Sequence, residues 1–433
     1  MTFKREYVKN AEGLAGDSDK TINKEVRESV HKILEEVRES GDEAIRKFTK
    51  KFDNVYREDL KINNGEIEEA KDNLSEEDRK AINYTIDNVR RFHEAQRDNL
   101  LDFEKEFKPG VRIGLRFIPI ETTGVYIPGG RYPLVASPVM LIVPAVISGV
   151  EKIVACAPPQ KDGSIIDSQL YAMNEAGADE IYCVGGAQAI GAMTYGTNTV
   201  PKVSKITGPG NIYTQEAKRQ VFGEVGIDFL AGPSEVLIIA DDSSDPDLIA
   251  TDLLAQAEHD PRSRPVLVST APDIAQKVLR TVEEKLPKLK TEKTAKACWE
   301  NNGEVIVVDD IKSAVEVANE YAMEHVQVMT EEPRSLLDDL SNYGSLFLGE
   351  HSPVVFGDKS VGSNHVLPTG RTARFTGGIW AGTYLKALSH QELTDKGARE
   401  IAHWAEKICE LEGTHAHKLS AKARSSHMEE DKE

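Results

Sequence analysis

The chain has 433 residues, 39% of them hydrophobic and 29% charged, so it can bury the cores of roughly two to four domains. Its 72 Asp and Glu residues outnumber its 53 Lys and Arg residues, which gives a net charge of −19, and the sequence contains no basic stripe. Nucleic acid and anionic membranes are therefore excluded as expected partners, and an anionic substrate would need cations close to its site.

The cysteine spacing and the apolar segments indicate the cell compartment in which the protein is expected. Cys156, Cys183, Cys298 and Cys409 form no CxxC pair, which is typical of reduced thiols rather than disulfides. Residues 1–13 lack the apolar core of a signal peptide. The uncharged stretch 133–150 contains three prolines and is shorter than the ~20 apolar residues of a membrane span, so it predicts a buried helix. We expect a cytoplasmic protein.

Charged, helix-patterned sequence makes up the N-terminal part of the chain. From residue 20 to about residue 107, apolar residues recur at helical spacing and predict solvated amphipathic helices. Arg112–Ile120 then alternates like a strand, and residues 125–127 lead into the turn Pro128-Gly129-Gly130. We therefore predict a helical N-terminal region over residues 1–110.

Short β-branched runs then alternate with helical patterns. The predicted strands are 152–157, 180–184, 203–207, 235–240, 265–269, 304–307, 326–329 and 345–348. The predicted helices between them include 211–222, 246–259, 274–286 and 313–321. This alternation predicts parallel sheets with helices on both faces, in two successive α/β domains at 111–234 and 235–376. After Thr376 no further strand is expected, and residues 377–433 are predicted to be helical with a disordered tail from Ser425.

Two glycine-containing turns are candidates for binding a dinucleotide. The run Thr207–Tyr213 contains only the first two glycines of the G-x-G-x-x-G pattern, and Gly185–Gln188 is a second such turn. Each follows a predicted strand and opens a helix whose N-terminus can accept a phosphate. Ordinary βα turns explain either sequence equally well. No Walker A sequence occurs, which disfavours phosphoryl transfer.

Histidines, carboxylates and one glutamine suggest a metal site. Gln256 and His259 lie three residues apart at the end of a predicted helix, so one face of that helix carries both. Further candidate groups follow at Asp358, His365, Glu412, His415 and His417. Nitrogen and oxygen ligands without thiolate favour zinc or a similar divalent ion. A structural role for the Gln256 and His259 pair remains the alternative.

Adjacent acid–base residues and three arginines complete the set of candidates. Glu324 and His325 precede a predicted strand and combine a carboxylate with a proton acceptor suited to neutral pH, although a packed histidine beside an exposed glutamate would look the same. Arg131, Arg371 and Arg374 stand near glycine-rich turns, where a guanidinium can bind a sulfonate, phosphate or carboxylate. Most surface arginines have no such role.

Several separated segments together resemble one family. They are GVYIPGG at 124–130, GGAQ at 185–188, TGPGN at 207–211, AGPSEV at 231–236, LAQAEH at 254–259, EH at 324–325, SNHVLPT at 363–369 and EGTHAH at 412–417. From about residue 20 to residue 424, the chain resembles the histidinol dehydrogenase family. These are zinc enzymes that oxidise an alcohol to a carboxylate with two NAD.

The resemblance implies a fold and a role for each matching residue. It implies two incomplete Rossmann-like domains with helical N-terminal and C-terminal extensions, in a homodimer whose C-terminal segment completes the partner's active site. The implied metal ligands are Gln256, His259, Asp358 and His417, with Glu324 and His325 as the catalytic pair. The implied NAD-contacting residues are Tyr126, Gln188 and Asn211. The implied substrate-binding residues are Ser234, Gln256, His259, His325, Asp358, His365, Glu412 and His417.

Departures from the family pattern bear on the substrate. Arg131-Tyr132 and Gly377–Trp380 stand where histidinol dehydrogenases usually have other residues, and they resemble the sulfopropanediol dehydrogenase branch. That branch oxidises (R)-2,3-dihydroxypropane-1-sulfonate to sulfolactate, and Arg131 would bind the sulfonate. The alternatives are histidinol dehydrogenase itself, which oxidises L-histidinol to L-histidine, and a non-catalytic relative that binds metal. The presence of all the candidate ligands and of both catalytic residues disfavours the last alternative.

Overall fold

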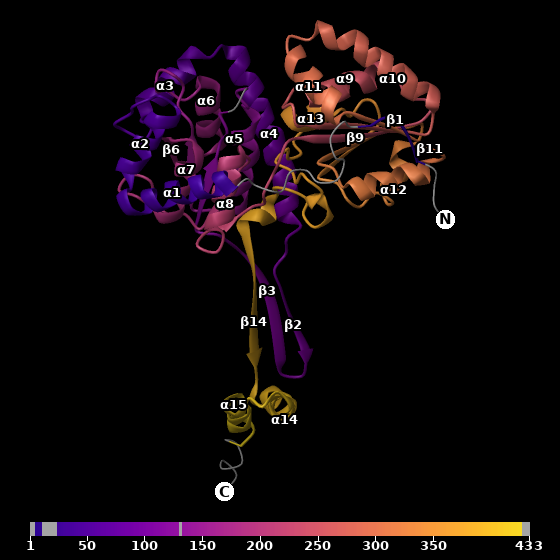
Figure 1. Ribbon diagram of the computed structural model, residues 1–433. Helices are drawn as coiled ribbons and strands as arrows, with labels where there is room; N and C mark the ends of the chain where they lie inside the picture. Colours follow the sequence, from indigo (N-terminus) through magenta and orange to yellow (C-terminus); the bar gives the residue numbers. More distant parts are fainter. Residues whose placement is uncertain (1–4, 11–23, 130–131, 427–433) are drawn as a thin grey trace. The chain divides into compact units, whose positions relative to one another are not determined.

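The computed structural model describes residues 5–10, 24–129 and 132–426. The chain forms two compact units (Figure 1). Unit 1 comprises Met1–Ala95 and Ile120–Tyr384, and unit 2 comprises Gln96–Pro119 and Leu385–Glu433. In the described residues no helix is long and apolar enough to cross a membrane.

The first sheet of unit 1 is parallel throughout, with strand order β6-β5-β4-β7-β8. Its strands are β4 (Thr122–Tyr126), β5 (Lys152–Ala157), β6 (Glu180–Cys183), β7 (Lys205–Thr207) and β8 (Gly226–Ile227). The helices after these strands are α5 (Ala136–Ser148), α6 (Asp167–Ala176), α7 (Gly186–Tyr195) and α8 (Ile212–Val221). The N-terminal helices are α1 (Lys24–Ser40), α2 (Asp42–Phe52), α3 (Asn64–Asn73) and α4 (Glu76–Asp98).

Alternate side chains of the first sheet enter two different cores. Ile153 and Ala155 pack with α4, α5 and α6, whereas Val154 and Cys156 pack with α1, α2, α7 and α8. Strands buried on both faces read as continuous apolar runs, which is why the sequence predicted them. The predicted buried helix at 133–150 is α5, in which residues 137–145 and Ser148 are buried.

The segment before α3 covers the outer edge of the first sheet. Ile62 donates its N–H to the carbonyl oxygen of Ile181 at 2.8 Å, and Cys183 donates to that of Leu60 at 2.8 Å. Edge strands expose unpaired backbone groups, so these bonds satisfy the free side of β6.

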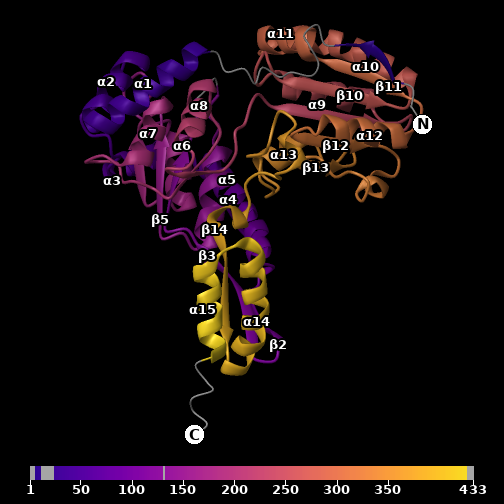
Figure 2. The same ribbon diagram turned by 60° about the horizontal axis from the view of Figure 1, so that its bottom comes forward.

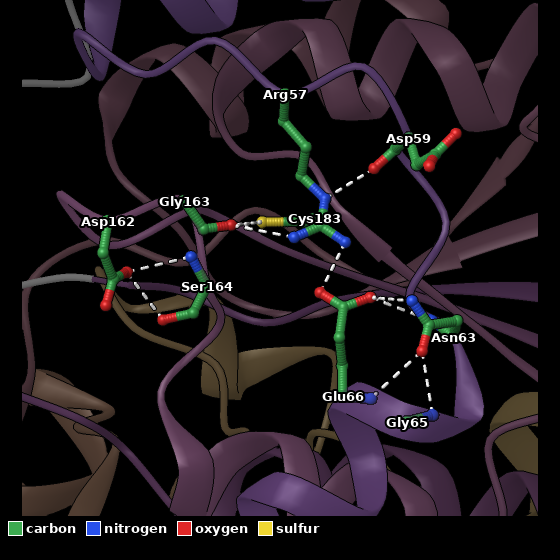
Figure 3. Close-up of polar contacts among 9 residues, drawn as sticks. All are labelled: Arg57, Asp59, Asn63, Gly65, Glu66, Asp162, Gly163, Ser164 and Cys183. Atoms are coloured by element: carbon green, nitrogen blue, oxygen red, sulfur yellow. Dashed lines mark hydrogen bonds and ion pairs between the residues drawn. The ribbon is translucent and has the colours of Figure 1, made fainter.

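Side-chain contacts hold this edge segment in place (Figure 3). Arg57 donates to the carbonyl oxygen of Gly163 at 3.0 Å and to the carboxylate of Glu66 at 2.6 Å. Glu66 also accepts from the backbone of Asn63, whose side chain caps α3 in return. The network therefore fixes β6, whose end leads directly into the turn at Gly185.

The second sheet of unit 1 has the order β1-β11-β10-β9-β12-β13. Its strands are β1 (Arg5–Lys9), β9 (Glu235–Ala240), β10 (Arg264–Ser269), β11 (Glu304–Val308), β12 (His325–Met329) and β13 (Ser345–Leu348). Only β1, which the sequence did not predict, runs antiparallel to its neighbour. The helices are α9 (Pro246–Ala257), α10 (Pro272–Lys285), α11 (Glu292–Asn302), α12 (Ile311–Tyr321) and α13 (Val354–Lys359), with short 3-10 turns at 286–288, 333–336, 372–374 and 381–384.

This sheet also separates two cores. Val236 and Ile238 face α9 and α10, while Leu237 and Ile239 face α12. The expected α/β fold with parallel sheets is confirmed, and the predicted strands of unit 1 end within two residues of the observed ones.

Unit 2 combines a three-stranded antiparallel sheet with two helices that pack against each other (Figure 2). Its elements are β2 (Phe103–Lys108), β3 (Val111–Pro119), β14 (Leu385–Leu393), α14 (Asp395–Glu412) and α15 (His415–Ser426). The expectation that strands stop at Thr376 is wrong, as is the expectation of helix up to residue 107. Both β2 and β14 are almost wholly exposed, so they carry no buried apolar run, and pairing with β3 holds them extended.

Candidate active site

The carboxyl ends of β4 and β7 define one candidate binding region. From β4 the chain adds β5 and β6 on one side and then returns to place β7 on the other side of β4. In a parallel sheet this reversal leaves a crevice between the two neighbouring strand ends, where ligands bind. The two glycine turns noted in the sequence, at Gly185 and Gly208, both lie at this edge.

The turn after β7 requires glycine. Gly208 has φ +121°, and a Cβ there would lie 2.2 Å from the carbonyl oxygen of Tyr126. A Cβ at Gly210 would lie 2.1 Å from Oγ1 of Thr214. The helices α7 and α8 begin at this edge, and helix N-termini at the carboxyl edge of a parallel sheet are a common place for phosphate.

The three residues expected to contact NAD lie around these turns. Tyr126 is buried at the end of β4, and its hydroxyl accepts a hydrogen bond from the N–H of Gly186 at 3.1 Å. Burial raises the pKa of Tyr126 to about 12, so at neutral pH its own proton stays available for donation. Gln188 is buried in α7, and its Oε1 lacks a hydrogen-bond partner. The side chain of Asn211 caps α8 by accepting from the N–H groups of Tyr213 and Thr214, at 2.9 and 3.2 Å.

A second group of candidate residues lies at the amino edge of the second sheet. The strand β12 begins at His325, and β9, beside it, begins at Glu235. Because a helix that follows a parallel strand runs back along it, the last turn of α9, which contains Gln256, lies near the edge where β9 begins. Sequence segments almost 90 residues apart thus supply one site.

Glu235 is the common anchor of Glu324 and His325, the two residues expected to be catalytic. Its N–H donates to Oε2 of Glu324 at 2.9 Å, and its carbonyl oxygen accepts from Nδ1 of His325 at 2.9 Å. A carbonyl can only accept, so Nδ1 carries a hydrogen and Nε2 is the nitrogen that can take a proton. Nε2 lies 3.2 Å from Oδ1 of Asp358, but neither atom makes a hydrogen bond of regular geometry.

Burial and neighbouring charges shift the pKa values of Glu324, His325 and Asp358. Burial raises the pKa of Glu324 to about 8. Burial alone would lower the pKa of His325, but the negative charges of Glu324 and Asp358 outweigh it and raise that pKa to about 9. Burial alone would raise the pKa of Asp358, but the interaction with His325 outweighs it and holds that pKa well below the usual range. Such shifts in a buried cluster are typical of reactive sites.

A cavity of about 380 Å³ is lined on one side by Asp358, the residue that faces His325. Its wall includes Gln256, His259, Asp358 and His365, together with Lys359. Burial lowers the pKa of His259, which keeps its imidazole neutral and able to bind a metal. Two buried atoms here lack hydrogen-bond partners: Oδ1 of Asp358, which could bind a metal, and Nε2 of Gln256, a donor that could bind only an acceptor.

His365 is held at both ring nitrogens. Nδ1 donates to the carbonyl oxygen of Asp358 at 2.7 Å, and Nε2 lies 3.1 Å from Oγ of Ser137. Ser137 is fully buried in α5. The contact therefore joins the helices of the first sheet to the cavity of the second sheet, and burial lowers the pKa of His365.

Other expected residues lie elsewhere. Ser234 is half-buried directly before β9, where its carbonyl oxygen accepts from the N–H of Arg264. Arg371 and Arg374 both donate to the carbonyl oxygen of Glu320. Arg131 lies outside the described residues, so its proposed contact with an anion is not tested.

The two C-terminal candidates belong to unit 2. Glu412 ends α14, His417 lies in α15, and both side chains are exposed. Among the described residues, no group of three His, Cys, Asp or Glu side chains is arranged to hold a metal ion. His259 and Asp358 of unit 1 thus need the amide of Gln256 and a further ligand.

Three residues near the site were missed in the sequence. Glu235 binds Glu324 and His325 through its backbone, and because any residue type could make these bonds, the sequence does not reveal them. Ser137 lies within an apolar run, where a lone serine is the only signal. Lys359 directly follows the predicted ligand Asp358, and that position was the signal available.

Comparison with known proteins gives the family. The sequence profile of the histidinol dehydrogenase family matches residues 17–425. A histidinol dehydrogenase homolog from Shouchella clausii is 43% identical over 97% of this chain and 98% of its own. A histidinol dehydrogenase from Methanothermobacter thermautotrophicus is 44% identical over 90% of this chain and 92% of its own. The crystal structure of histidinol dehydrogenase from Elizabethkingia anophelis superposes with a TM-score of 0.89 at 36% identity, covering 96% of this chain and 94% of that one.

The fold and the site thus define an α/β oxidoreductase with two parallel sheets. The chain belongs to the histidinol dehydrogenase family and is an NAD-dependent enzyme of that family.

Proposed function

We propose that the protein oxidises a primary alcohol to a carboxylate through an aldehyde, with NAD and zinc. The substrate we propose is (R)-2,3-dihydroxypropane-1-sulfonate and the product sulfolactate. The observation that carries the proposal is the buried pair Glu324 and His325, joined through Glu235 beside a cavity with metal-ligand chemistry. An acid and a base of different kinds at one point suit two successive oxidations.

Zinc fits the residues around the cavity. Gln256, His259 and Asp358 provide an amide, a neutral imidazole and a carboxylate, and Oδ1 of Asp358 is a buried oxygen without a hydrogen-bond partner. We propose these three as ligands and His417 of a second copy of the chain as the fourth. When bound, zinc supplies a Lewis acid that polarises the reacting oxygen of the substrate.

NAD fits the carboxyl edge of the first sheet. The glycines at 208 and 210 leave no room for a Cβ, and two helices begin beside them. We propose that Tyr126, Gln188 and Asn211 contact the cofactor, with the unpaired Oε1 of Gln188 accepting a hydrogen bond from it. When bound, NAD supplies the hydride acceptor of each oxidation.

The chain's own residues handle the protons. In the first oxidation, the neutral form of His325 takes the hydroxyl proton of the alcohol at Nε2, and the neighbouring carboxylates stabilise the imidazolium that forms. Because the pKa of His325 is about 9, this neutral form becomes abundant only in mildly alkaline solution. In the second oxidation, Glu324 orients water and removes its proton as the oxygen adds to the aldehyde carbon. The backbone N–H of Glu235 holds the Glu324 carboxylate in place for this step.

A homodimer would complete the site. On α14 and α15, large apolar side chains are exposed in unit 2: Trp404 at 61%, Ile408 at 54%, Leu411 at 85% and Leu419 at 66%. Positions 404, 408 and 411 share one face of α14, and such a face needs a partner surface. We propose that a second copy covers it, and that Glu412 and His417 reach the partner's cavity.

Among the described residues, the cavity wall carries one cation that could bind an anionic substrate, Lys359, beside the three carboxylates Asp252, Glu258 and Asp358. Two of its acids already have partners, since Asp252 accepts from Gln327 at 3.0 Å and Glu258 accepts from Thr291 at 2.8 Å. Lys359, by contrast, is half-exposed, with its nearest carboxylate contact at 4.0 Å. We propose that Lys359 gives the cation that a sulfonate requires.

L-Histidinol is the second candidate substrate, because relatives of 44% and 39% identity carry the name histidinol dehydrogenase. The zinc-loaded enzyme should be given each alcohol separately at equal concentration in moderate salt. NADH formation with dihydroxypropanesulfonate alone supports the proposal. If only histidinol is oxidised, histidinol is the substrate and the proposed sulfonate is wrong. If neither alcohol is oxidised, the proposed alcohol dehydrogenase activity is wrong.

A further inference from the structure

A fully buried ion pair lies beneath the glycine turn of the proposed NAD site. Lys218 of α8 pairs with Asp228, which directly follows β8, and each side chain is only 1% exposed. Removing two charges from water is costly, and an apolar pair of similar volume often stabilises a protein equally well. A buried pair at this position therefore calls for a reason other than stability.

The pair holds both polar groups of Gly208. The ammonium of Lys218 donates to the carbonyl oxygen of Gly208 at 2.9 Å, and Asp228 accepts from the N–H of Gly208 at 2.8 Å. Gly208 has φ +121°, one of several backbone conformations open to glycine, and these two bonds select it. Apolar side chains could fill the same space but could not make these bonds.

The same helix holds the segment that leads to the catalytic pair. We call residues 228–235 the strap, because they run from β8 to the start of β9. Lys218 also donates to the carbonyl oxygen of Phe229 at 2.9 Å, and Gln215 accepts from the N–H of Ala231 at 3.0 Å. The strap ends at Glu235, whose backbone bonds to both Glu324 and His325.

We propose that Lys218 and Asp228 are positioning residues that set the cofactor turn and the strap in one fixed relation. The ion pair orients the backbone of Gly208 for the dinucleotide and ties it, through the strap, to the anchor of the catalytic residues. The inference rests on the proposed function in one respect, namely that NAD binds at this edge.

The test uses the full-length, zinc-loaded protein and three variants. Lys218→Met and Asp228→Asn each break the pair, and the double variant Lys218→Met/Asp228→Leu removes both charges. Arg219→Met is the matched control, because Arg219 lies on the same helix and pairs with the buried carboxylate of Glu216 at 2.7 Å without touching Gly208. NAD affinity is measured by calorimetry, stability by urea unfolding, and KM for NAD and kcat by NADH formation.

We expect the single variants to weaken NAD binding by about tenfold or more, as for loss of a charge-assisted bond. In the double variant the midpoint of unfolding should return toward that of the wild type while NAD affinity stays low. Arg219→Met should bind NAD within about twofold of the wild type, whatever its stability.

The outcomes separate the two proposals. If the wild type does not bind NAD, the proposed cofactor site is wrong. If the wild type binds NAD and the double variant binds it equally well, the ion pair is merely structural and the inference fails. Should Lys218→Met not fold, Asp228→Asn, which keeps size and shape, decides the question by the same affinity measurement.

Discussion

His325 and Asp358 face each other across 3.2 Å, from Nε2 to Oδ1, and Asp358 lies in the wall of the cavity. The other nitrogen of His325 is bound to the backbone of Glu235, so the ring cannot turn without losing a buried bond. The proposed base is therefore fixed beside a proposed metal ligand. The alcohol oxidation and the aldehyde oxidation can each be tested separately.

Replacing Glu324 with Gln should separate the two oxidations. The amide keeps the size of the side chain but cannot take a proton from water, so aldehyde oxidation should fall by about 100-fold or more. Alcohol oxidation should fall much less, because His325 keeps its bond to Glu235. Rapid mixing with alcohol or with aldehyde, following NADH, measures each step. Equal losses in both would rule out this division of roles.

Removing candidate ligands should lower the metal content. Gln256→Ala and His259→Ala each remove one proposed ligand from the cavity wall, so zinc per chain should drop after dialysis against a mild chelator. Lys285→Ala, on a surface pair with Asp247, serves as the control. Atomic absorption gives the stoichiometry. Retention of full zinc by both ligand variants would move the metal site elsewhere.

Alanine variants of Gly208 and Gly223 can distinguish the cost of a positive φ from the cost of a steric clash, because both glycines have a positive φ. Gly208→Ala places a Cβ 2.2 Å from the carbonyl oxygen of Tyr126, whereas Gly223→Ala, at φ +110°, meets nothing within 4 Å. Both pay the backbone cost of about 1–3 kcal/mol for a non-glycine residue, but Gly208→Ala should lose clearly more. Urea unfolding of both variants measures the difference, and similar losses would mean that the turn can relax.

The elements of unit 1 were predictable because their strands are buried on both faces. The exposed strands β2 and β14 were not, since FEKEFK and LKALSHQEL lack any buried run. Within the site, the residue types of Gln256 and His259 were informative. A helix lysine such as Lys218 normally reads as solvent-exposed, so only the structure reveals its buried bonds.

Lys359 should affect affinity for an anionic substrate more than the chemistry. Lys359→Met keeps the length of the side chain but removes its charge, so KM for dihydroxypropanesulfonate should rise by about 10- to 100-fold. The kcat should change little, and a neutral diol should be unaffected. Lys359→Arg should restore most of the affinity. An unchanged KM would leave Arg131 as the cation to examine.

The most direct test of the account is the number of NADH formed per alcohol consumed by the zinc-loaded wild-type enzyme, with an aldehyde trap in the solution. The account predicts two NADH per alcohol and no trapped aldehyde, because Glu324 and His325 act on one retained intermediate. One NADH per alcohol, with the aldehyde recovered in the trap, would contradict it.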